Sequence, residues 1–268
     1  MNLLQTNFQT DKPVALVTGS GAPRVGQVIA RHLASLGCRL ALHAYQSVNE
    51  AKLCADEIAK EFETEVIVTQ GSLEESGVAE SIVNDVARHF GRIDILVNSA
   101  AIWHPTRLEE VTAEELLRYY QINTLSCWMA ARAAGLIMAE QESGGCIINI
   151  SDWATVRPYL DHAAYFPSKG GVDAMTHSLA VELGHRNPNI RVNGIKPGPV
   201  LLAKEVDKEQ QEKIAQSTLV KRVGTAEHIA HAVQFLCENT FVNGSFITVD
   251  GGRSIFAPDG LQVGMNTG

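Results

Sequence analysis

The sequence predicts a doubly wound parallel α/β sheet of about seven strands with helices on both faces. Three observations support this prediction. Short, largely apolar runs alternate with longer amphipathic stretches along the 268 residues, a glycine-rich turn follows the first apolar run, and no linker, internal repeat or low-complexity segment divides the chain. Together these features indicate a single-domain, Rossmann-type fold.

The apolar runs are the predicted strands, because strands buried on both faces of a parallel sheet contain few polar residues. They are residues 14–18, 39–44, 65–70, 94–99, 146–151, 190–195 and 245–250. Helical patterns lie at 26–36, 48–61, 74–90, 112–123 continuing to about 140, 162–186 and 226–238. The domain is expected at 13–256, with a flexible N-terminal tail at 1–12 and a C-terminal tail at 257–268. The charge-rich segment 201–217 is expected to form either a mobile helical lid or a solvated surface helix.

The composition argues against several classes of partner. A formal net charge of -8 without a block of basic residues disfavours nucleic acid and anionic membranes. No apolar run approaches the ~18 residues of a membrane span, and the first dozen residues lack a signal-peptide pattern, so a cytoplasmic protein is expected. The five cysteines are scattered and never form a C-x-x-C pair, which argues against a disulfide framework or a metal site.

The first strand runs into TGSGAPRVGQVIA, where Gly19 and Gly26 bracket a loop and a helix is expected to start near Arg24. Glycine lets the backbone approach a pyrophosphate, and the free N–H groups of a helix start bind the anion. The loop does not match G-x-G-x-x-G, because Arg24 takes the place of the third glycine. Its position after the first strand of a parallel sheet is what favours a nucleotide-binding loop.

The end of the second strand indicates which nicotinamide cofactor is bound. An acidic residue there accepts hydrogen bonds from the ribose of NAD and repels the 2′-phosphate of NADP. Here the residues are His43, Tyr45, Gln46 and Ser47, and Arg24 adds a positive charge within reach. The sequence therefore favours NADPH over NADH. The alternative is that Ser47 merely caps the next helix and that Arg24 is solvated.

Tyr165 and Lys169 are four residues apart and therefore lie on one face of a predicted helix. A free tyrosine has a pKa of about 10, and a neighbouring ammonium lowers this pKa by favouring the phenolate. Such a pair can deliver a proton to a substrate atom while a nicotinamide delivers hydride. A tyrosine and a lysine at this spacing are common in helices, and they indicate an acid–base pair only together with the glycine loop.

With these motifs, residues 13–253 resemble the short-chain dehydrogenase/reductase family. The resemblance rests on TGSGAPRVG, NSAA (98–101), Asn123, Tyr165 with Lys169, KPGP (196–199) and VDGG (249–252). It implies Tyr165 as the proton donor and Lys169 as the residue that holds the nicotinamide ribose. Asn123 would anchor a proton-relay water, and Asn98 would lie against the cofactor.

The resemblance also implies the set of residues that bind the cofactor. They are Gly19, Arg24, Val25, Gly26, His43, Tyr45, Gln46, Ser47, Ser72, Leu73, Asn98, Ser99, Ala100, Tyr165, Lys169, Pro197, Gly198 and Val200. The chain departs from the family pattern at several places: the glycine loop is one residue longer, Ser72 replaces an aspartate, and PGPVLLA lacks a threonine. The residue seven beyond Tyr165 is Val172, so the longer tyrosine–lysine spacing of the family's enoyl reductases is absent.

The family's catalytic serine usually stands thirteen residues before the tyrosine, and here that residue is Asp152, with Ser151 one step earlier. An ionised carboxylate repels a carbonyl oxygen, so Asp152 fits either a protonated acid or a substrate that presents an N–H donor. This substitution resembles the family's pteridine reductases, as does NSAAIWHPTRL, in which Trp103 would stack on a pterin. The implied substrate-binding residues are Arg24, Trp103, Ser151, Asp152 and Tyr165.

The leading hypothesis is an NADPH-dependent reductase that transfers hydride to a pteridine-like C=N bond. Its implied catalytic residues are Asn123, Asp152, Tyr165 and Lys169. One alternative is an NADP(H)-dependent carbonyl reductase or alcohol dehydrogenase of the same family, which a Ser151 turned toward the substrate would favour. Another is a non-catalytic NADP(H)-binding sensor. The resemblance also implies a homotetramer or dimer formed through the helices at about 112–140 and 162–186.

Overall fold

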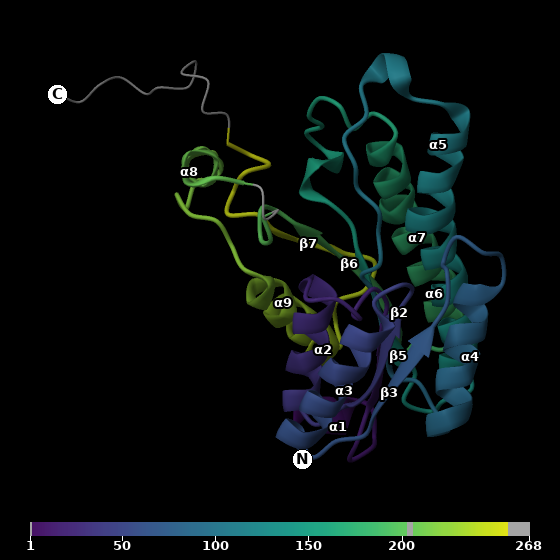
Figure 1. Ribbon diagram of the computed structural model, residues 1–268. Coiled ribbons are helices and arrows are strands. Elements are labelled where there is room, and N and C mark those ends of the chain that lie inside the picture. The colour runs from purple at the N-terminus through teal and green to yellow at the C-terminus, as the bar shows by residue number, and fades with distance from the viewer. Residues whose placement is uncertain (1, 203–205, 257–268) are drawn as a thin grey trace.

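The computed structural model describes residues 2–202 and 206–256, and its seven-stranded parallel sheet confirms the predicted fold class (Figure 1). The strands are β1 (Val14–Val17), β2 (Arg39–Ala44), β3 (Val66–Gln70), β4 (Ile95–Asn98), β5 (Gly145–Ile150), β6 (Ile190–Pro197) and β7 (Phe246–Val249). Their order is β3-β2-β1-β4-β5-β6-β7, and every neighbouring pair is parallel. The strand order reverses between β1 and β4, and open α/β sheets bind their ligands at such a switch point.

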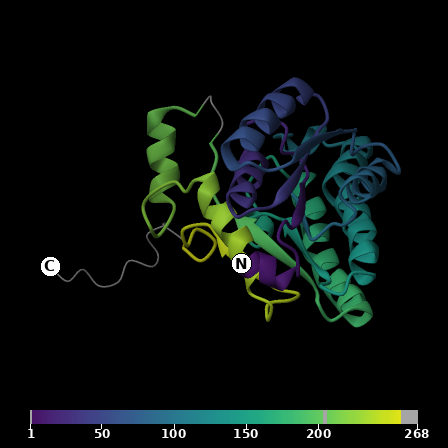
Figure 2. The same cartoon turned by 90° about the horizontal axis from the view of Figure 1, so that it is seen from below.

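Helices cover both faces of the sheet. One face carries α2 (Val25–Ser35), α3 (Val48–Phe62) and α9 (Ala226–Glu238), and the other carries α4 (Val78–Phe90), α6 (Ser126–Ala139) and α7 (Tyr165–Arg186) (Figure 1; Figure 2). Before α6 the chain forms a 3-10 turn (Leu108–Glu110), helix α5 (Ala113–Tyr119) and a π-helical segment (Tyr120–Leu125). The single helix predicted from 112 to about 140 therefore contains one irregular turn.

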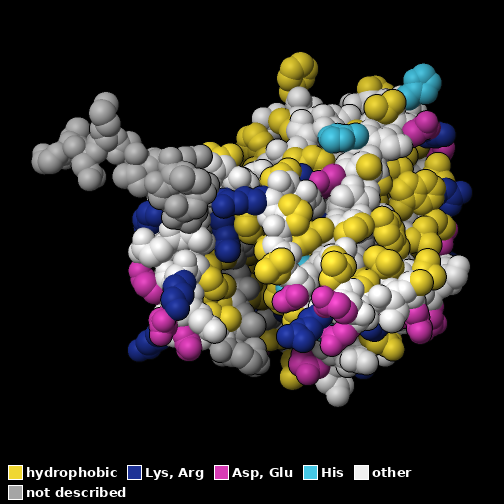
Figure 3. Space-filling view, turned by 90° about the horizontal axis from the view of Figure 1, so that it is seen from above, with side chains coloured by type: hydrophobic (Ala, Val, Ile, Leu, Met, Phe, Trp, Pro, Cys, Tyr) yellow, Lys and Arg dark blue, Asp and Glu magenta, His cyan; other side chains and the backbone are white. Residues whose placement is uncertain are grey.

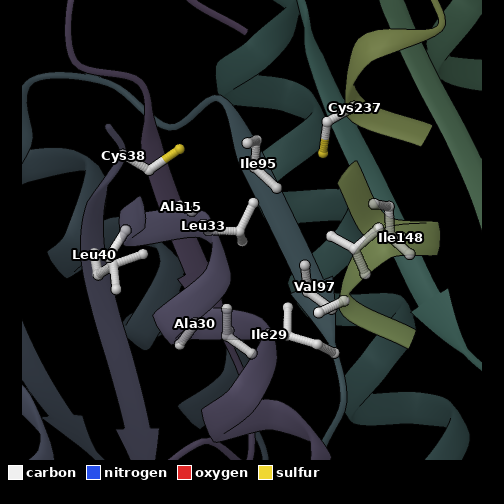
Figure 4. Packing of buried hydrophobic residues seen from close by; sticks show 14 of the residues in the cluster. Ala15, Ile29, Ala30, Leu33, Cys38, Leu40, Ile95, Val97, Ile148 and Cys237 are labelled. Carbon is white, nitrogen blue, oxygen red and sulfur yellow. The ribbon is translucent and has the colours of Figure 1, made fainter. Parts of the chain in front are cut away.

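A core of apolar side chains fills the space between the sheet and α2 (Figure 4). Ile29, Ala30 and Leu33 recur every three to four residues along α2 and are fully buried, so they form its inward face. They pack with Leu40 from β2 and Val97 from β4. Burial of each large aliphatic side chain stabilises the fold by about 1.5–3 kcal/mol. This layer fixes the strand ends that carry the glycine loop.

The N-terminal residues form a helix, α1 (Leu3–Asn7), so the prediction of a flexible tail at 1–12 is wrong for this stretch. The side chain of Asn2 accepts a hydrogen bond from the Gln5 backbone N–H at 3.0 Å, and Gln5 reciprocates to close a capping box. Leu4 and Phe8 are four residues apart on one face and are buried in the core, with α1 in contact with α9. Two apolar residues among polar ones gave too weak a pattern to predict this docking.

Helix α8 (Lys208–Gln216) lies within the segment 201–217 and stands out from the body of the molecule (Figure 1; Figure 2). Asp207 caps it by accepting a hydrogen bond from the Gln210 N–H at 2.8 Å. Its closure over the site stays a prediction, and the predicted C-terminal tail at 257–268 lies outside the described residues. In the parts of the chain that the structure describes, every helix is too short or too polar for a bilayer crossing.

Candidate active site

A cavity of about 860 Å³ opens at the carboxyl ends of the central strands. Its walls come from the segments that directly follow β1, β2, β4 and β5, and they include Gly19, Tyr45, Ser99 and Ser151. Figure 3 looks onto this end of the molecule, where hydrophobic side chains are mixed with a few charged ones. A volume of this size lies within the range of roughly 300–1,000 Å³ that small-molecule and cofactor sites occupy.

The glycine loop lies closer to the neighbouring backbone than side chains would allow. Gly19 has a φ of +67°, and a Cβ on it would lie 2.8 Å from the Ala100 Cα. A Cβ on Gly21 would lie 2.5 Å from the Ala44 Cβ. Helix α2 then begins without a side-chain cap from Arg24, and the Gln27 N–H donates to the Arg24 carbonyl oxygen, so the N–H groups of Val25 and Gly26 are the ones available to an anion. This geometry suits a bound pyrophosphate.

His43 supports the glycine loop and uses both of its ring nitrogens to do so. The backbone N–H of Gly19 donates to Nδ1 at 3.2 Å, and Nε2 lies 3.1 Å from the Gly71 carbonyl oxygen. These partners fit a neutral ring with its proton on Nε2, and burial favours that form by lowering the pKa of His43. His43 lines the cavity with both ring nitrogens held by the protein, and its contact with a cofactor stays a prediction.

The segments after β2 and β3 form the cavity wall where the adenosine half of a cofactor is expected. The predicted residues there are Arg24, Tyr45, Gln46, Ser47, Ser72 and Leu73, and all line the cavity. The side chain of Ser47 makes no capping hydrogen bond with α3, so the alternative role of a simple helix cap is not supported. Arg24 is exposed and forms no ion pair with any described residue.

Three of the predicted catalytic residues meet at the end of β5. Tyr165 opens α7, and its hydroxyl donates to Oδ2 of Asp152 at 2.9 Å. Oδ1 of Asp152 accepts from the Ala154 N–H at 2.8 Å, which caps the 3-10 turn Trp153–Thr155. Nζ of Lys169 donates to the carbonyl oxygen of Ile150 at 2.8 Å. The spacing in α7 thus brings Lys169 beneath the strand end that carries Asp152.

Burial shifts the pKa values of Asp152, Tyr165 and Lys169. Burial raises the pKa of Asp152, and the hydrogen bonds from Ala154 and Tyr165 and the Lys169 charge oppose that rise. Burial, followed by the charge of Asp152, raises the pKa of Tyr165 well above its ordinary value. Burial lowers the pKa of Lys169. The prediction that the ammonium lowers the pKa of the tyrosine is therefore wrong for this arrangement, because burial and, after it, the Asp152 carboxylate both favour the neutral phenol.

Asn98 and Asn123 lie behind the cavity wall rather than on it. Asn123, in the π-helical segment, accepts from the Ile102 N–H at 2.8 Å and donates to the Ile102 carbonyl oxygen at 3.1 Å. Asn98 donates to Oδ1 of Asn149 at 3.0 Å. Both are buried, so they fix the segment after β4, and the roles of Asn123 as a water anchor and of Asn98 beside a cofactor stay predictions.

Ser151 directs its hydroxyl away from Tyr165. The hydroxyl donates to the carboxylate of Asp173, which also forms an ion pair with Lys196 at 2.6 Å. Successive residues of an extended chain point to opposite sides, so Ser151 and Asp152 face different surroundings. In the structure Ser151 is therefore bonded to Asp173, and Asp152 is the side chain that contacts the tyrosine.

Aromatic rings form the outer wall of the cavity. Trp103 is 47% exposed, its Nε1–H donates to the Tyr159 hydroxyl at 3.1 Å, and its ring stacks on His162 with centroids 4.6 Å apart. Trp153 and Tyr159 stack with an interplanar angle of 27°. Trp153 is buried, whereas Trp103 and Tyr159 are exposed and present flat apolar surfaces that suit an aromatic substrate.

Most of the predicted site residues line the cavity. They are Gly19, Arg24, Val25, Gly26, His43, Tyr45, Gln46, Ser47, Ser72, Leu73, Ser99, Ala100, Trp103, Ser151, Asp152, Tyr165, Lys169, Pro197 and Gly198. The exceptions are Asn98, Asn123 and Val200, and Val200 packs into the apolar core. Lining residues that the sequence did not predict include Tyr159, Leu201, Leu202, Val206, Ile214 and Arg253. Across residues 2–202 and 206–256, no three His, Cys, Asp or Glu side chains gather as a metal site would require.

The chain matches known proteins over most of its length. Residues 22–254 match a family model described as Enoyl-(Acyl carrier protein) reductase. The chain is 30% identical to versicolorin reductase 1 from Aspergillus parasiticus over 265 residues, which cover 93% of this chain and 99% of the relative. It is 30% identical to a 3-oxoacyl-(acyl-carrier-protein) reductase from Rattus norvegicus over 248 residues, which cover 92% and 100%. A crystal structure named as a short-chain alcohol dehydrogenase from Sinorhizobium meliloti 1021 matches with a TM-score of 0.83 and 28% identity, covering 90% of this chain and 96% of that one.

Proposed function

Because the chain belongs to the short-chain dehydrogenase/reductase family and is an oxidoreductase of that type, we propose that it reduces a carbonyl group of a small aromatic molecule with NADPH. The observation that carries the proposal is the buried group of Tyr165, Asp152 and Lys169 in a cavity that also contains the glycine loop. One relative is named for the reduction of a 3-oxoacyl group, which supports carbonyl chemistry over C=N chemistry.

The residues present fit a nicotinamide cofactor, because the close-packed glycines of the loop, the start of α2 and Lys169 line one cavity. Bound NADPH supplies hydride for the substrate carbon. Tyr165 gives its proton to the substrate oxygen, so the carbonyl gains one hydride and one proton and becomes an alcohol. The Lys169 ammonium, buried in the same wall, opposes the negative charge that remains on the tyrosine.

A carbonyl substrate requires Asp152 to be protonated. An ionised carboxylate would repel the substrate oxygen, whereas a neutral carboxyl group can donate a hydrogen bond to it, as a serine hydroxyl does. Burial raises the pKa of Asp152, which favours the neutral form. Asp152 would therefore assist Tyr165 below its raised pKa and oppose binding of the carbonyl above it.

NADPH is the proposed cofactor because the residues that follow β2 in the cavity wall are neutral and Arg24 lies on the same wall. A 2′-phosphate would meet the Arg24 guanidinium together with the hydroxyl groups of Tyr45 and Ser47. The exposed position of Arg24 leaves its guanidinium able to reach a phosphate without breaking an ion pair within the described residues.

A C=N bond in a pteridine-like heterocycle is the second candidate, and Asp152 is the observation that favours it. An ionised Asp152 can accept a hydrogen bond from a ring N–H, and the exposed face of Trp103 offers a stacking surface. The relatives named above are not pteridine reductases, so this candidate rests on these residues alone.

Oxidation of NADPH, followed by the loss of nicotinamide absorbance, tests these proposals. The substrates are a panel of aromatic ketones and quinones together with dihydrobiopterin and dihydrofolate, and each assay is repeated with NADH. We expect turnover of ketones, with NADPH preferred. Turnover of pterins alone would move the protein to the second candidate. Tight NADPH binding without turnover of any substrate would instead support a sensor.

A further inference from the structure

Arg253 projects into the substrate end of the cavity. It follows β7, lines the cavity wall, and holds its guanidinium carbon 4.7 Å from the centroid of the Trp153 ring. Trp153 is buried and directly follows Asp152, so the arginine lies over the segment that carries the catalytic carboxylate. Stacking of a guanidinium on an aromatic face fixes its plane and leaves its N–H edge free for a ligand.

The structure gives this guanidinium no acidic partner among the residues it describes. The carboxylate of its neighbour Asp250 is occupied by the N–H groups of Gly252 at 2.8 Å and of Ser254 at 2.6 Å. The carboxylate of Asp152 is occupied by Ala154 and Tyr165. The remaining acids of the described chain form no ion pair with Arg253.

A second arginine lies close to Arg253. Nη1 of Arg157 donates to the Arg253 carbonyl oxygen at 3.2 Å, which brings a second guanidinium against the Arg253 backbone. Burial lowers the pKa of Arg253, so part of its hydration shell has been lost without an ion pair to replace it. An oxyanion bound here would supply the anionic partner that the described residues do not give this guanidinium.

We propose that Arg253 binds a carboxylate of the substrate, so that the preferred substrate is an aromatic ketone that carries an acidic group at the end remote from the reacting carbonyl. The proposal rests on the proposed carbonyl reduction at Tyr165. The aromatic body of the substrate would lie along the exposed rings of Trp103 and Tyr159, with the ketone at Tyr165 and the carboxylate on the guanidinium. A fork of two parallel N–H groups matches the two oxygens of a carboxylate.

The test compares 6-acetyl-2-naphthoate with its neutral isostere 6-acetyl-2-naphthamide. Binding of each to the NADPH complex is measured by calorimetry, and NADPH oxidation is measured with both. We expect the wild type to bind the acid about 10- to 100-fold more tightly than the amide, the range for a hydrogen bond to a charged group. Arg253→Gln should reduce this preference to within about twofold, while Arg253→Lys should keep part of it.

Arg88→Gln, which removes a highly exposed arginine of α4, is the matched control and should leave the preference unchanged. Equal binding of acid and amide to the wild type, or a preference that survives in Arg253→Gln, would overturn the proposal. So would a loss of NADPH affinity in that variant, because Arg253 would then serve the cofactor. An Arg253-dependent preference without any turnover would support the binding site and count against carbonyl reduction, so the two failures are distinguishable.

Discussion

The hydroxyl of Tyr165 donates a hydrogen bond to Asp152, and Tyr165 lies four residues before Lys169. Tyr165→Phe keeps the ring and its packing but removes the transferable proton. We expect kcat/KM for ketone reduction to fall by about 10²- to 10⁴-fold, the range for loss of a general acid. The Kd for NADPH, measured by nicotinamide fluorescence, should change by less than about twofold, since loss of one neutral hydroxyl removes little binding energy. Retained turnover would mean that another group, such as Asp152, supplies the proton.

Asp152 should give the enzyme a pH dependence with a definite sign. A carboxyl group with a raised pKa keeps its proton to higher pH than the ordinary value of about 3.9. Burial raises the pKa of Asp152, so the neutral, donating form is present below that raised pKa and is lost as the pH rises through it. We expect kcat/KM for a neutral ketone to fall as the pH rises through this pKa. Asp152→Ser should abolish this alkaline limb of the pH profile, because a serine does not ionise.

The profile is measured from acidic to alkaline pH with one neutral ketone and a fixed saturating NADPH concentration. Asp152→Asn is the companion variant, because its side-chain oxygen can still accept from the Ala154 N–H and keep the turn capped. A wild-type profile without this limb would show that Asp152 stays in one protonation state. Rates that rise with pH would instead favour an ionised Asp152 and the C=N candidate.

At the scale of single elements, α1 shows how a short helix contributes to stability. Leu4 is fully buried, while its neighbour Leu3 is 59% exposed. We expect Leu4→Ala to lower the free energy of unfolding by about 2–5 kcal/mol, as for other buried leucines. Leu3→Ala should change it by less than about 0.5 kcal/mol. Urea denaturation of both variants measures the difference, and equal midpoints would show that α1 is not docked on α9 in solution.

The elements also show which features the sequence could predict. The seven strands could be predicted because a short apolar run such as VALVT can be recognised from the local sequence alone. Each predicted run overlaps an observed strand. Three features depend on contacts between distant segments instead. The docking of α1 needs α9, the π-helical segment turns Asn123 onto Ile102, and the pKa of Tyr165 depends on which partner its hydroxyl meets. The position of Arg253 in the site could not be predicted from the sequence either, because its stacking on Trp153 joins residues 100 positions apart.

At the scale of the whole molecule, the parallel sheet brings site residues from distant parts of the chain to one end of the fold. The glycine loop follows β1, Asp152 follows β5, and Arg253 follows β7, and all three lie at the same end of the parallel sheet. Both core layers must be in place before these loops meet, because α2 and α7 pack on opposite faces. The site is therefore as stable as the fold, apart from the projecting segment around α8.

The layer that contains α6 and α7 leaves large apolar side chains exposed, and we expect it to form the contact of a homodimer or homotetramer. Leu125 and Val181 are 45% and 72% exposed, whereas Trp128 and Met129 pack partly against the core. Light scattering should give a mass that is a multiple of the 29.0 kDa chain. Val181→Glu should shift it toward the monomer, because a buried unpaired carboxylate opposes association.

Leu53→Glu, at a 65% exposed position on the opposite face, should leave the mass unchanged. A monomeric wild type would show that there is no such contact. Loss of assembly with Leu53→Glu but not with Val181→Glu would place the contact on the opposite face.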